Sequence, residues 1–222
     1  MRSAFDAPIL CYVTDGQEFL PTERHRALLP RISAAIDAGV DWIQIREKDL
    51  SGGALLALAR EAVKMSTAAG RGTRILVNDR VDVALAAGAA GVHLGADALP
   101  VNEVVEWRRK GDFPAGFSIG ASCHSVKDAQ AAEAAGADHL FFGPVFYTPS
   151  KRMFGAPQGV GRLDQVCRAI KIPVLAVGGI QEKDAPECLK AGGAGIAAIR
   201  LFQQSREPMD FRDLVSRLHA FG

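Results

Sequence analysis

The stretch Ala135-Gly136-Ala137-Asp138-His139-Leu140-Phe141-Phe142-Gly143-Pro144-Val145 carries the pattern that decides the fold. A glycine that follows an alanine-rich helical segment can adopt the left-handed conformation that ends the helix. The apolar run His139–Val145, with its aromatic residues, then has the composition of a strand covered on both faces. The stretch therefore predicts a unit of helix, glycine stop and buried strand.

The same unit recurs along the chain. Ala38-Gly39-Val40-Asp41, Ala87-Gly88-Ala89-Ala90-Gly91 and Ala191-Gly192-Gly193-Ala194-Gly195 each follow a helical pattern and precede a short apolar run. Runs such as Val174-Leu175-Ala176-Val177 are continuously apolar, which is typical of parallel strands that lie between helices. This weak internal repeat predicts alternating strands and helices.

Eight strand and helix units account for nearly the whole chain. Strands are expected over Ile9–Thr14, Trp42–Glu47, Arg74–Asn78, Gly91–Leu94, Ser118–Ser122, His139–Val145, Pro173–Gly178 and Gly195–Leu201. Helices are expected near residues 24–38, 51–69, 80–88, 100–110, 126–135, 160–170, 182–191 and 208–220. With no linker or charge block, this pattern favours a single TIM-barrel domain, a closed (β/α)8 barrel over residues 1–222, and a doubly wound open sheet is the alternative.

Composition excludes several classes of protein. The net charge of +1 gives no bulk field that would attract nucleic acid or a membrane surface, and no segment has eighteen uninterrupted apolar residues. The four cysteines, Cys11, Cys123, Cys167 and Cys188, are scattered, which argues against a disulfide framework and for a reducing compartment. Without an apolar signal segment at the N-terminus, we expect a cytoplasmic protein that binds neither nucleic acid nor membrane.

Polar side chains gather where the predicted strands end, which is where barrel enzymes place their sites. After the sixth strand, Thr148, Ser150 and Lys151 offer two hydroxyl donors and a positive charge to a phosphate. After the seventh, Gly178-Gly179 lets backbone N–H groups approach a phosphate, and Arg200 follows the eighth. A tight turn is the other interpretation of the paired glycines.

The second strand ends in Gln44-Ile45-Arg46-Glu47-Lys48-Asp49. Strand alternation points Gln44, Arg46 and Lys48 to one side, and two inward cations at a barrel mouth predict an anion site. The alternative is a solvated salt-bridge cluster of the charged residues from 46 to 49.

Two carboxylates and a serine–histidine pair complete the candidates. Asp79, which follows Asn78, and Asp97 are each a candidate Mg²⁺ ligand or a helix N-cap. Ser122 and His124 share a side of the fifth strand, but no Gly-x-Ser-x-Gly elbow supports a serine hydrolase. Two cationic groups and a cation site together predict two phosphorylated small-molecule ligands, one of them a metal-bound diphosphate.

These motifs, in this order and spacing, resemble the thiamine phosphate synthase family and its relative thiazole tautomerase. The resemblance rests on Gln44–Asp49, Asn78–Asp82, Gly91–Gly95, Gly143–Lys151 and Gly178–Ile180. It implies a synthase that joins hydroxymethylpyrimidine diphosphate to thiazole phosphate. The residues that it implies for the pyrimidine diphosphate are Gln44, Arg46, Lys48, Asn78, Ser122 and Lys151, with Mg²⁺ on Asp79. Those implied for the thiazole phosphate are Thr148, Ser150, Gly179, Ile199 and Arg200.

The chain departs from the family pattern at three positions. Ala98 stands where the family has its second metal carboxylate, with Asp97 one place before it, Ala96 replaces a glutamine, and Arg200 replaces a serine. The alternatives are therefore a thiazole tautomerase with His124 as proton carrier and a non-catalytic phosphometabolite-binding barrel. Across these interpretations, the catalytic candidates are Lys151, Ser122 and His124, with His124 belonging to the tautomerase. A homodimer is an additional hypothesis about assembly.

Overall fold

The computed structural model describes residues 7–148, 156–203 and 208–221. Within them, eight parallel strands close into a barrel in sequence order, and β8 returns to β1. The strands are β1 Ile9–Val13, β2 Trp42–Ile45, β3 Arg74–Asn78, β4 Gly91–Leu94, β5 Ser118–Cys123, β6 His139–Phe142, β7 Val174–Val177 and β8 Gly195–Ala198. The predicted (β/α)8 barrel is confirmed, and the doubly wound sheet is excluded because this sheet closes on itself.

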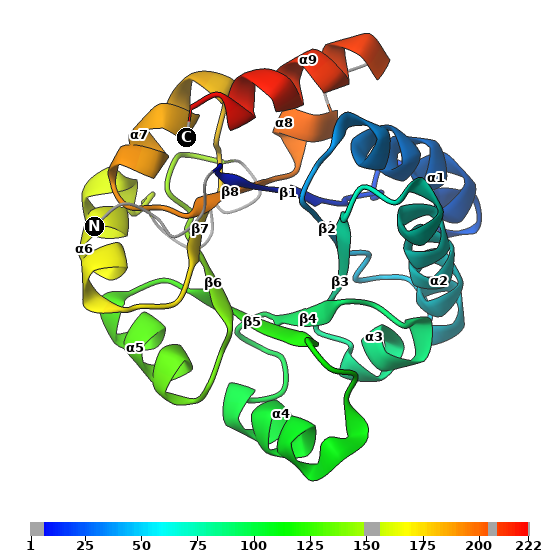
Figure 1. Cartoon of the computed structure of the whole chain (residues 1–222), viewed down its shortest axis with the longest axis horizontal. Coiled ribbons are helices and arrows are strands. Elements are labelled where there is room, and N and C mark those ends of the chain that lie inside the picture. Colours follow the sequence, from blue (N-terminus) through cyan, green and yellow to red (C-terminus); the bar gives the residue numbers. More distant parts are fainter. Residues whose placement is uncertain (1–6, 149–155, 204–207, 222) are drawn as a thin grey trace.

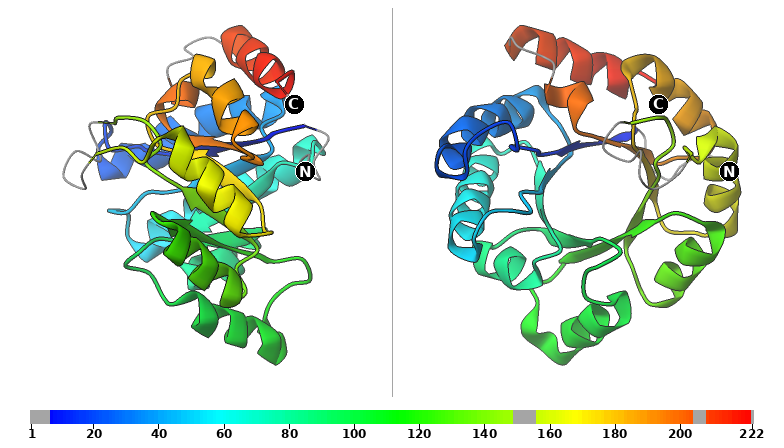
Figure 2. Two further views of the ribbon diagram at one scale, coloured as in Figure 1. Left: turned by 90° about the vertical axis from the view of Figure 1, so that its left-hand side faces the viewer. Right: turned by 180° about the vertical axis from the view of Figure 1, so that it is seen from behind.

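Helices encircle the ring of strands, as Figure 1 shows down the barrel and Figure 2 shows from the side and from behind. They are α1 Pro21–Ala38, α2 Gly52–Ala69, α3 Val81–Ala87, α4 Val101–Trp107, α5 Val126–Ala134, α6 Gly159–Ala169, α7 Ala185–Lys190, α8 Arg200–Gln203 and α9 Pro208–His219, with the π-helical turn η1 Arg108–Asp112 and the 3₁₀ helix η3 Glu182–Asp184. Among the helices of the described segments, none combines the length and apolar character that crossing a bilayer requires.

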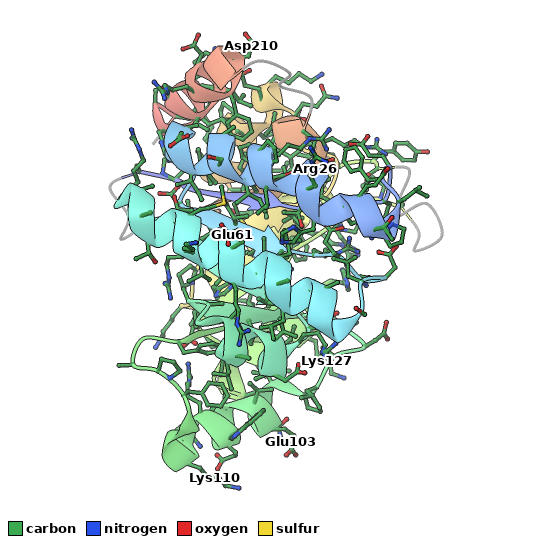
Figure 3. All side chains as sticks on the ribbon, turned by 90° about the vertical axis from the view of Figure 1, so that its right-hand side faces the viewer. Arg26, Glu61, Glu103, Lys110, Lys127 and Asp210 are labelled. Atoms are coloured by element: carbon green, nitrogen blue, oxygen red, sulfur yellow. The ribbon has the colours of Figure 1, made fainter. Side chains whose placement is uncertain are left out.

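The helices follow the amphipathic pattern of a barrel's outer layer. In α1, Leu28, Ile32 and Ile36 recur every four residues and are buried against the strands. Charged side chains such as Arg26 of α1 and Lys127 of α5 lie on the outer surface (Figure 3). The outward faces of the strands and the inward faces of the helices therefore form the main hydrophobic core.

Strand boundaries differ from prediction mainly at the carboxyl ends. Strands predicted to reach Thr14, Glu47, Val145, Gly178 and Leu201 end at Val13, Ile45, Phe142, Val177 and Ala198. The extra residues lie past the ends of the strands and form the rim of the barrel, where Thr14 N and Val145 N still donate to Gln44 O and Val177 O at 2.9 Å. The helix predicted over 182–191 is divided into η3 and α7, and the short helix α8 was not predicted.

The inside of the barrel holds two buried histidines among apolar side chains. Ile9, Cys11, Val13, Phe141, Leu175 and Ala197 form an interior cluster. The His93 ring stacks on Phe141 with a centroid distance of 3.9 Å, and the His139 ring meets Trp42 edge-on at 4.7 Å. Burial lowers the pKa of both imidazoles, that of His139 to about 4.

We expect the buried histidines to make the fold sensitive to acid. His139 titrates near pH 6.5 when unfolded and about 4 when folded, so its contribution is complete above pH 6.5 and is lost as the pH falls toward 4. The free energy of unfolding in urea should fall by about 2 kcal/mol between pH 7.5 and pH 5 through this residue alone. In a His139→Gln variant the fall should shrink by that amount, and an unchanged fall would contradict the assignment.

Candidate functional site

A cavity of about 1120 Å³ opens at the carboxyl ends of the strands. Small-molecule sites usually measure about 300–1,000 Å³, so the cavity has room for two small ligands. The predicted site residues that line it are Gln44, Arg46, Asn78, Ser122, His124, Thr148, Gly179, Ile199 and Arg200. Residues from six different strands or strand-end loops thus converge on one end of the barrel.

The remaining predicted residues lie elsewhere or outside the described segments. Lys48 and Asp97 are exposed and are not among the residues that line the cavity. Asp79 is half-buried beside Asn78, just behind the lining. Ser150 and Lys151 lie outside the residues that the structure describes. The binding roles of these five residues stay predictions.

A chain of hydrogen bonds joins the ends of β2, β3 and β4. The buried amide of Gln44 donates from Nε2 to Asn78 Oδ1 at 2.8 Å, and Asn78 Nδ2 donates to Asp79 Oδ2 at 2.6 Å. The backbone N–H of Gly95 donates to Asp79 Oδ1 at 2.7 Å. This network fixes both amide orientations and leaves Gln44 Oε1 as an acceptor at the cavity wall.

Asp79 holds an unusual backbone conformation. Its φ is +60°, and it is the one residue other than glycine with positive φ in the described segments. The carboxylate does not cap α3, because it accepts from Asn78 and Gly95 instead. Backbone strain of this kind costs of order 1–3 kcal/mol and clusters at functional sites. This backbone conformation therefore costs stability but holds the Asp79 carboxylate in one direction.

The donor set around Asp79 fits a metal ion that is shared with a ligand. Mg²⁺ commonly takes one or two carboxylates and completes its shell with water and substrate phosphates. In the described part of the chain, no three acidic, histidine or cysteine side chains come together as a complete site. Each Asp79 oxygen accepts one hydrogen bond and keeps a further lone pair for a cation.

A buried ion pair lies directly beneath Arg46. Glu47 accepts from the Thr14 hydroxyl at 2.6 Å and from the Gly16 N–H at 3.0 Å, and it lies 3.6 Å from Arg24 Nε. Thr14 Oγ1 in turn accepts from the Arg46 N–H at 2.9 Å. Burial raises the pKa of the Glu47 carboxyl, while these donors act in the opposite direction.

This network shows whether the charged residues from 46 to 49 pair with one another. Both acidic residues of the motif, Glu47 and Asp49, pair with Arg24 of α1. Among the described residues, neither pairs with Arg46 or Lys48. The predicted solvated salt-bridge cluster is therefore wrong, because both carboxylates pair with Arg24 instead. Arg46 lines the cavity, and within the described residues it has no ion pair with Glu47 or Asp49.

Glu47→Ala should destabilise the protein by about 2 kcal/mol. Breaking a buried ion pair usually costs about 3–5 kcal/mol, but Asp49 and the Phe19 carbonyl still hold the Arg24 guanidinium. Urea unfolding measures the effect. The double variant Arg24→Met/Glu47→Met serves as control and should recover part of the loss, because no uncompensated charge remains. A double variant less stable than Glu47→Ala would contradict the account.

The sequence singled out Ser122 but missed its partner. Ser122 Oγ lies 3.0 Å from His93 Nε2, and both line the cavity. His93 is 2% exposed, and its pKa is depressed well below the ordinary value by burial and by neighbouring His139. Strand alternation within Gly91–Leu94 could have identified His93 as inward-facing. Its pairing with β5 could not be read from sequence.

His124 lies at the exposed rim, away from Ser122's hydrogen bond. Its Nδ1 bonds to the Gly143 carbonyl, which can only accept, so Nδ1 carries the hydrogen. Nε2 is then the basic nitrogen. Ser122 and His124 both line the cavity, but Ser122 pairs with His93. No Ser122–His124 dyad forms between these described residues.

The loops after β6 and β7 are joined by backbone hydrogen bonds. Val145 N donates to Val177 O at 2.9 Å, and Phe146 N donates to Gly178 O at 3.0 Å. Gly178 and Gly179 have φ of +96° and +69°. A Cβ on Gly179 would lie 2.4 Å from the Tyr147 carbonyl oxygen, so a side chain has no room. The close contact brings Thr148 next to the paired glycines, so the glycines do more than turn the chain.

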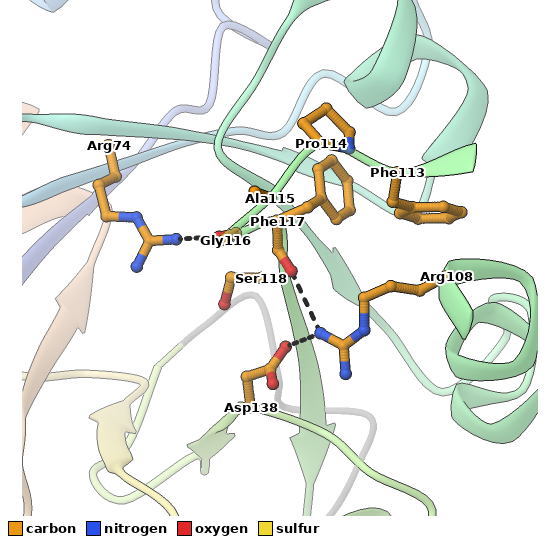
Figure 4. Close-up of a pocket in the computed structure, with 9 residues that line it drawn as sticks. All are labelled: Arg74, Arg108, Phe113, Pro114, Ala115, Gly116, Phe117, Ser118 and Asp138. Carbon is orange, nitrogen blue, oxygen red and sulfur yellow. Dashed lines mark hydrogen bonds and ion pairs between the residues drawn. The ribbon is translucent and has the colours of Figure 1, made fainter. Parts of the chain in front are cut away.

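A second cavity, of about 420 Å³, lies at the opposite end of the barrel (Figure 4). Arg108 pairs there with Asp138 at 2.5 Å, and Arg74 Nη2 donates to the Gly116 carbonyl at 3.1 Å. These bonds join the strand-start loops and serve the chain's own acceptors. The candidate site is therefore the larger cavity, which is lined by nine of the predicted site residues.

The chain is similar in sequence and fold to known proteins. The family model described as thiamine monophosphate synthase matches residues 10–202. A putative thiamine-phosphate synthase of Geobacter sulfurreducens is 44% identical over 200 residues, covering 88% of this chain and 91% of that protein. The thiamine-phosphate synthase of Methanoculleus marisnigri is 43% identical, covering 86% and 85%. The solved thiamine phosphate pyrophosphorylase of Pyrococcus furiosus superposes with a TM-score of 0.78 at 30% identity, covering 97% and 96%.

Proposed function

This chain belongs to the thiamine monophosphate synthase family, a family of transferases in thiamine biosynthesis, and we propose that it joins hydroxymethylpyrimidine diphosphate to thiazole phosphate with release of diphosphate. The observation that carries the proposal is the hydrogen-bonded chain from Gln44 through Asn78 to Asp79 beside Arg46, which forms no ion pair within the described residues. It offers a neutral acceptor for an aminopyrimidine next to groups that suit a diphosphate.

The deep end of the cavity suits the pyrimidine diphosphate. Gln44 Oε1 is free to accept from the exocyclic amino group, because Gln44 Nε2 is committed to Asn78. The second Asn78 Nδ2 hydrogen, the Ser122 hydroxyl and the Arg46 guanidinium can donate to diphosphate oxygens. Lys48 and Lys151 remain proposed contributors of positive charge to the same group.

In the proposed step, the bond between the methylene carbon and the diphosphate oxygen breaks, and a bond forms from the thiazole nitrogen to that carbon. Diphosphate leaves with the electron pair, so no proton needs to move. Arg46 and the Asn78 and Ser122 donors stabilise the charge that grows on the leaving oxygen. The barrel holds the nitrogen and the carbon close together, which removes the entropy cost of a two-molecule encounter.

Asp79 would hold Mg²⁺, and the ion when bound would neutralise diphosphate charge. The carboxylate is already oriented by Asn78 and Gly95, so it need not reorganise when the substrate arrives. Asp97 is proposed only as an outer contributor, since it is exposed and does not line the cavity. This division of roles leaves Asp79 as the principal protein ligand.

The rim formed by the loops after β6, β7 and β8 suits the thiazole phosphate. Thr148, Gly179, Ile199 and Arg200 line this part of the cavity, and Ser150 is proposed to join them. Backbone N–H groups at a glycine pair can approach a phosphate closely, and Arg200 adds a charge. Two ligands would then meet with their reactive atoms between the two phosphate-binding regions. A cytoplasmic location and a homodimer accompany this proposal.

A coupling assay with both substrates, with and without Mg²⁺, tests the proposed function. We expect thiamine phosphate and diphosphate to form only when the metal is present. Conversion of thiazole carboxylate phosphate without metal would indicate a tautomerase that uses His124. Thermal stabilisation by the substrates without turnover would indicate a binding protein. Either of the last two outcomes would overturn the proposal.

A further inference from the structure

We propose that His93 is a positioning residue that donates its Nε2–H to Ser122 Oγ and thereby turns the Ser122 hydroxyl hydrogen toward the bound diphosphate. The inference deepens the proposed function and rests on it. It assigns a role to a buried imidazole that the coupling step does not otherwise use.

The geometry holds the pair in one arrangement. His93 projects from β4 and Ser122 from β5, and the two strands are hydrogen-bonded in register, with His93 opposite Gly120. The His93 ring is 2% exposed and stacks on Phe141 at 3.9 Å with an interplanar angle of 29°. An imidazole packed in this way cannot swing away from Ser122, so the 3.0 Å contact is fixed.

The ligand decides the direction of the hydrogen bond. The ionised oxygens of a bound diphosphate accept hydrogen bonds, so Ser122 donates its single hydroxyl hydrogen to them. That hydrogen is then not available for His93 Nε2. The contact between Ser122 Oγ and His93 Nε2 can only be made if His93 carries its hydrogen on Nε2.

The surroundings of His93 Nδ1 are consistent with a hydrogen on Nε2. His93 Nδ1 is buried and has no hydrogen-bond partner within the described residues. A buried N–H without an acceptor is rarer in proteins than a buried lone pair without a donor. A neutral imidazole has one ring hydrogen to place. Nε2 is the position where that hydrogen finds an acceptor.

His139 provides a matched comparison inside the same barrel. It is equally buried, its Nδ1 lies 3.1 Å from Ser118 Oγ, and its ring occupies the space that the missing side chain of Gly120 leaves. Ser118 lines the cavity at the opposite end, and His139 does not line the candidate site. A change at His139 therefore perturbs a buried histidine–serine pair without touching Ser122.

Steady-state kinetics of three single variants tests the role. His93→Leu should lower kcat/KM about tenfold, mostly in kcat, because charge on the diphosphate grows in the transition state. His93→Gln should recover most of the loss, since its amide can donate from a similar position. The kcat/KM of His139→Leu should stay within about threefold of that of the unmodified protein. A larger loss would contradict a role specific to His93.

A double variant separates positioning from packing. If His93 acts through Ser122, then Ser122→Ala/His93→Leu should be no slower than Ser122→Ala alone. Independent, multiplying losses would overturn the proposal. So would a His93→Gln variant as slow as His93→Leu.

Nitrogen NMR of the histidine side chains gives a readout that needs no turnover. With inorganic diphosphate bound, His93 should show a protonated Nε2 and a bare Nδ1, and His93→Leu should weaken diphosphate binding only when Ser122 is present. The opposite tautomer would overturn the proposal. An inactive protein that still shows this tautomer and this binding pattern would contradict the coupling function alone.

Discussion

Asp79→Asn is expected to cut the rate of coupling at least about 100-fold, which corresponds to roughly 3 kcal/mol of lost transition-state stabilisation. Asparagine removes the negative charge that would hold Mg²⁺, and its amide donor would face the Asn78 amide that now donates to Asp79. The fold should lose little, about 1 kcal/mol, because asparagine tolerates the positive φ at this position.

The measurement is kcat/KM as a function of Mg²⁺ concentration, beside the thermal midpoint. In Asp79→Asn, we expect the metal dependence to move to much higher concentration. Asp97→Asn is the matched control, since it removes the same charge from an exposed residue that does not line the cavity. It should change kcat/KM by less than about fivefold, a surface-charge effect. Equal losses in the two variants would contradict the assignment of Asp79 as principal ligand.

Gly179→Ala is the second change for which we expect a large effect. The new Cβ would meet the Tyr147 and Phe146 carbonyl oxygens at 2.4 and 2.7 Å, closer than carbon and oxygen normally approach. The chain must then shift, and the loop that carries Thr148 shifts with it because Phe146 is bonded to Gly178. We expect KM for the thiazole phosphate to rise about 100-fold, since a displacement near 1 Å commonly has this effect.

Gly88→Ala controls for backbone conformation. Gly88 also has a φ of +69°, but no atom would lie within 4 Å of a Cβ added there. It ends α3, away from the rim formed by the loops after β6, β7 and β8. It should cost about 1–2 kcal/mol of stability through the left-handed conformation alone. Coupling kinetics in Gly88→Ala should stay unchanged at a temperature where the protein is folded. If Gly179→Ala also left the coupling kinetics unchanged, the close packing between the loops after β6 and β7 would have no functional role.

The predictions that the structure confirmed concern properties that depend on residues adjacent in sequence. Glycine stops after alanine-rich helices and continuous apolar runs gave the order of elements, because helix termination and strand burial depend on a few adjacent residues. The end of a strand was less predictable. Thr14 and Glu47 lie just past the ends of β1 and β2, because their side chains join a network around Arg24.

The sequence by itself determined that eight parallel strands would present polar side chains at one end, since parallel strands share the direction of their carboxyl ends. Only the tertiary structure decided which groups pair there. Within the described residues, Glu47 and Asp49 pair with Arg24 and not with Arg46, Asp79 accepts from Gly95 instead of capping its own helix, and Ser122 contacts His93 instead of His124. A hydrogen bond or ion pair depends on distances of about 3 Å between strands far apart in sequence, and closure of the barrel sets those distances.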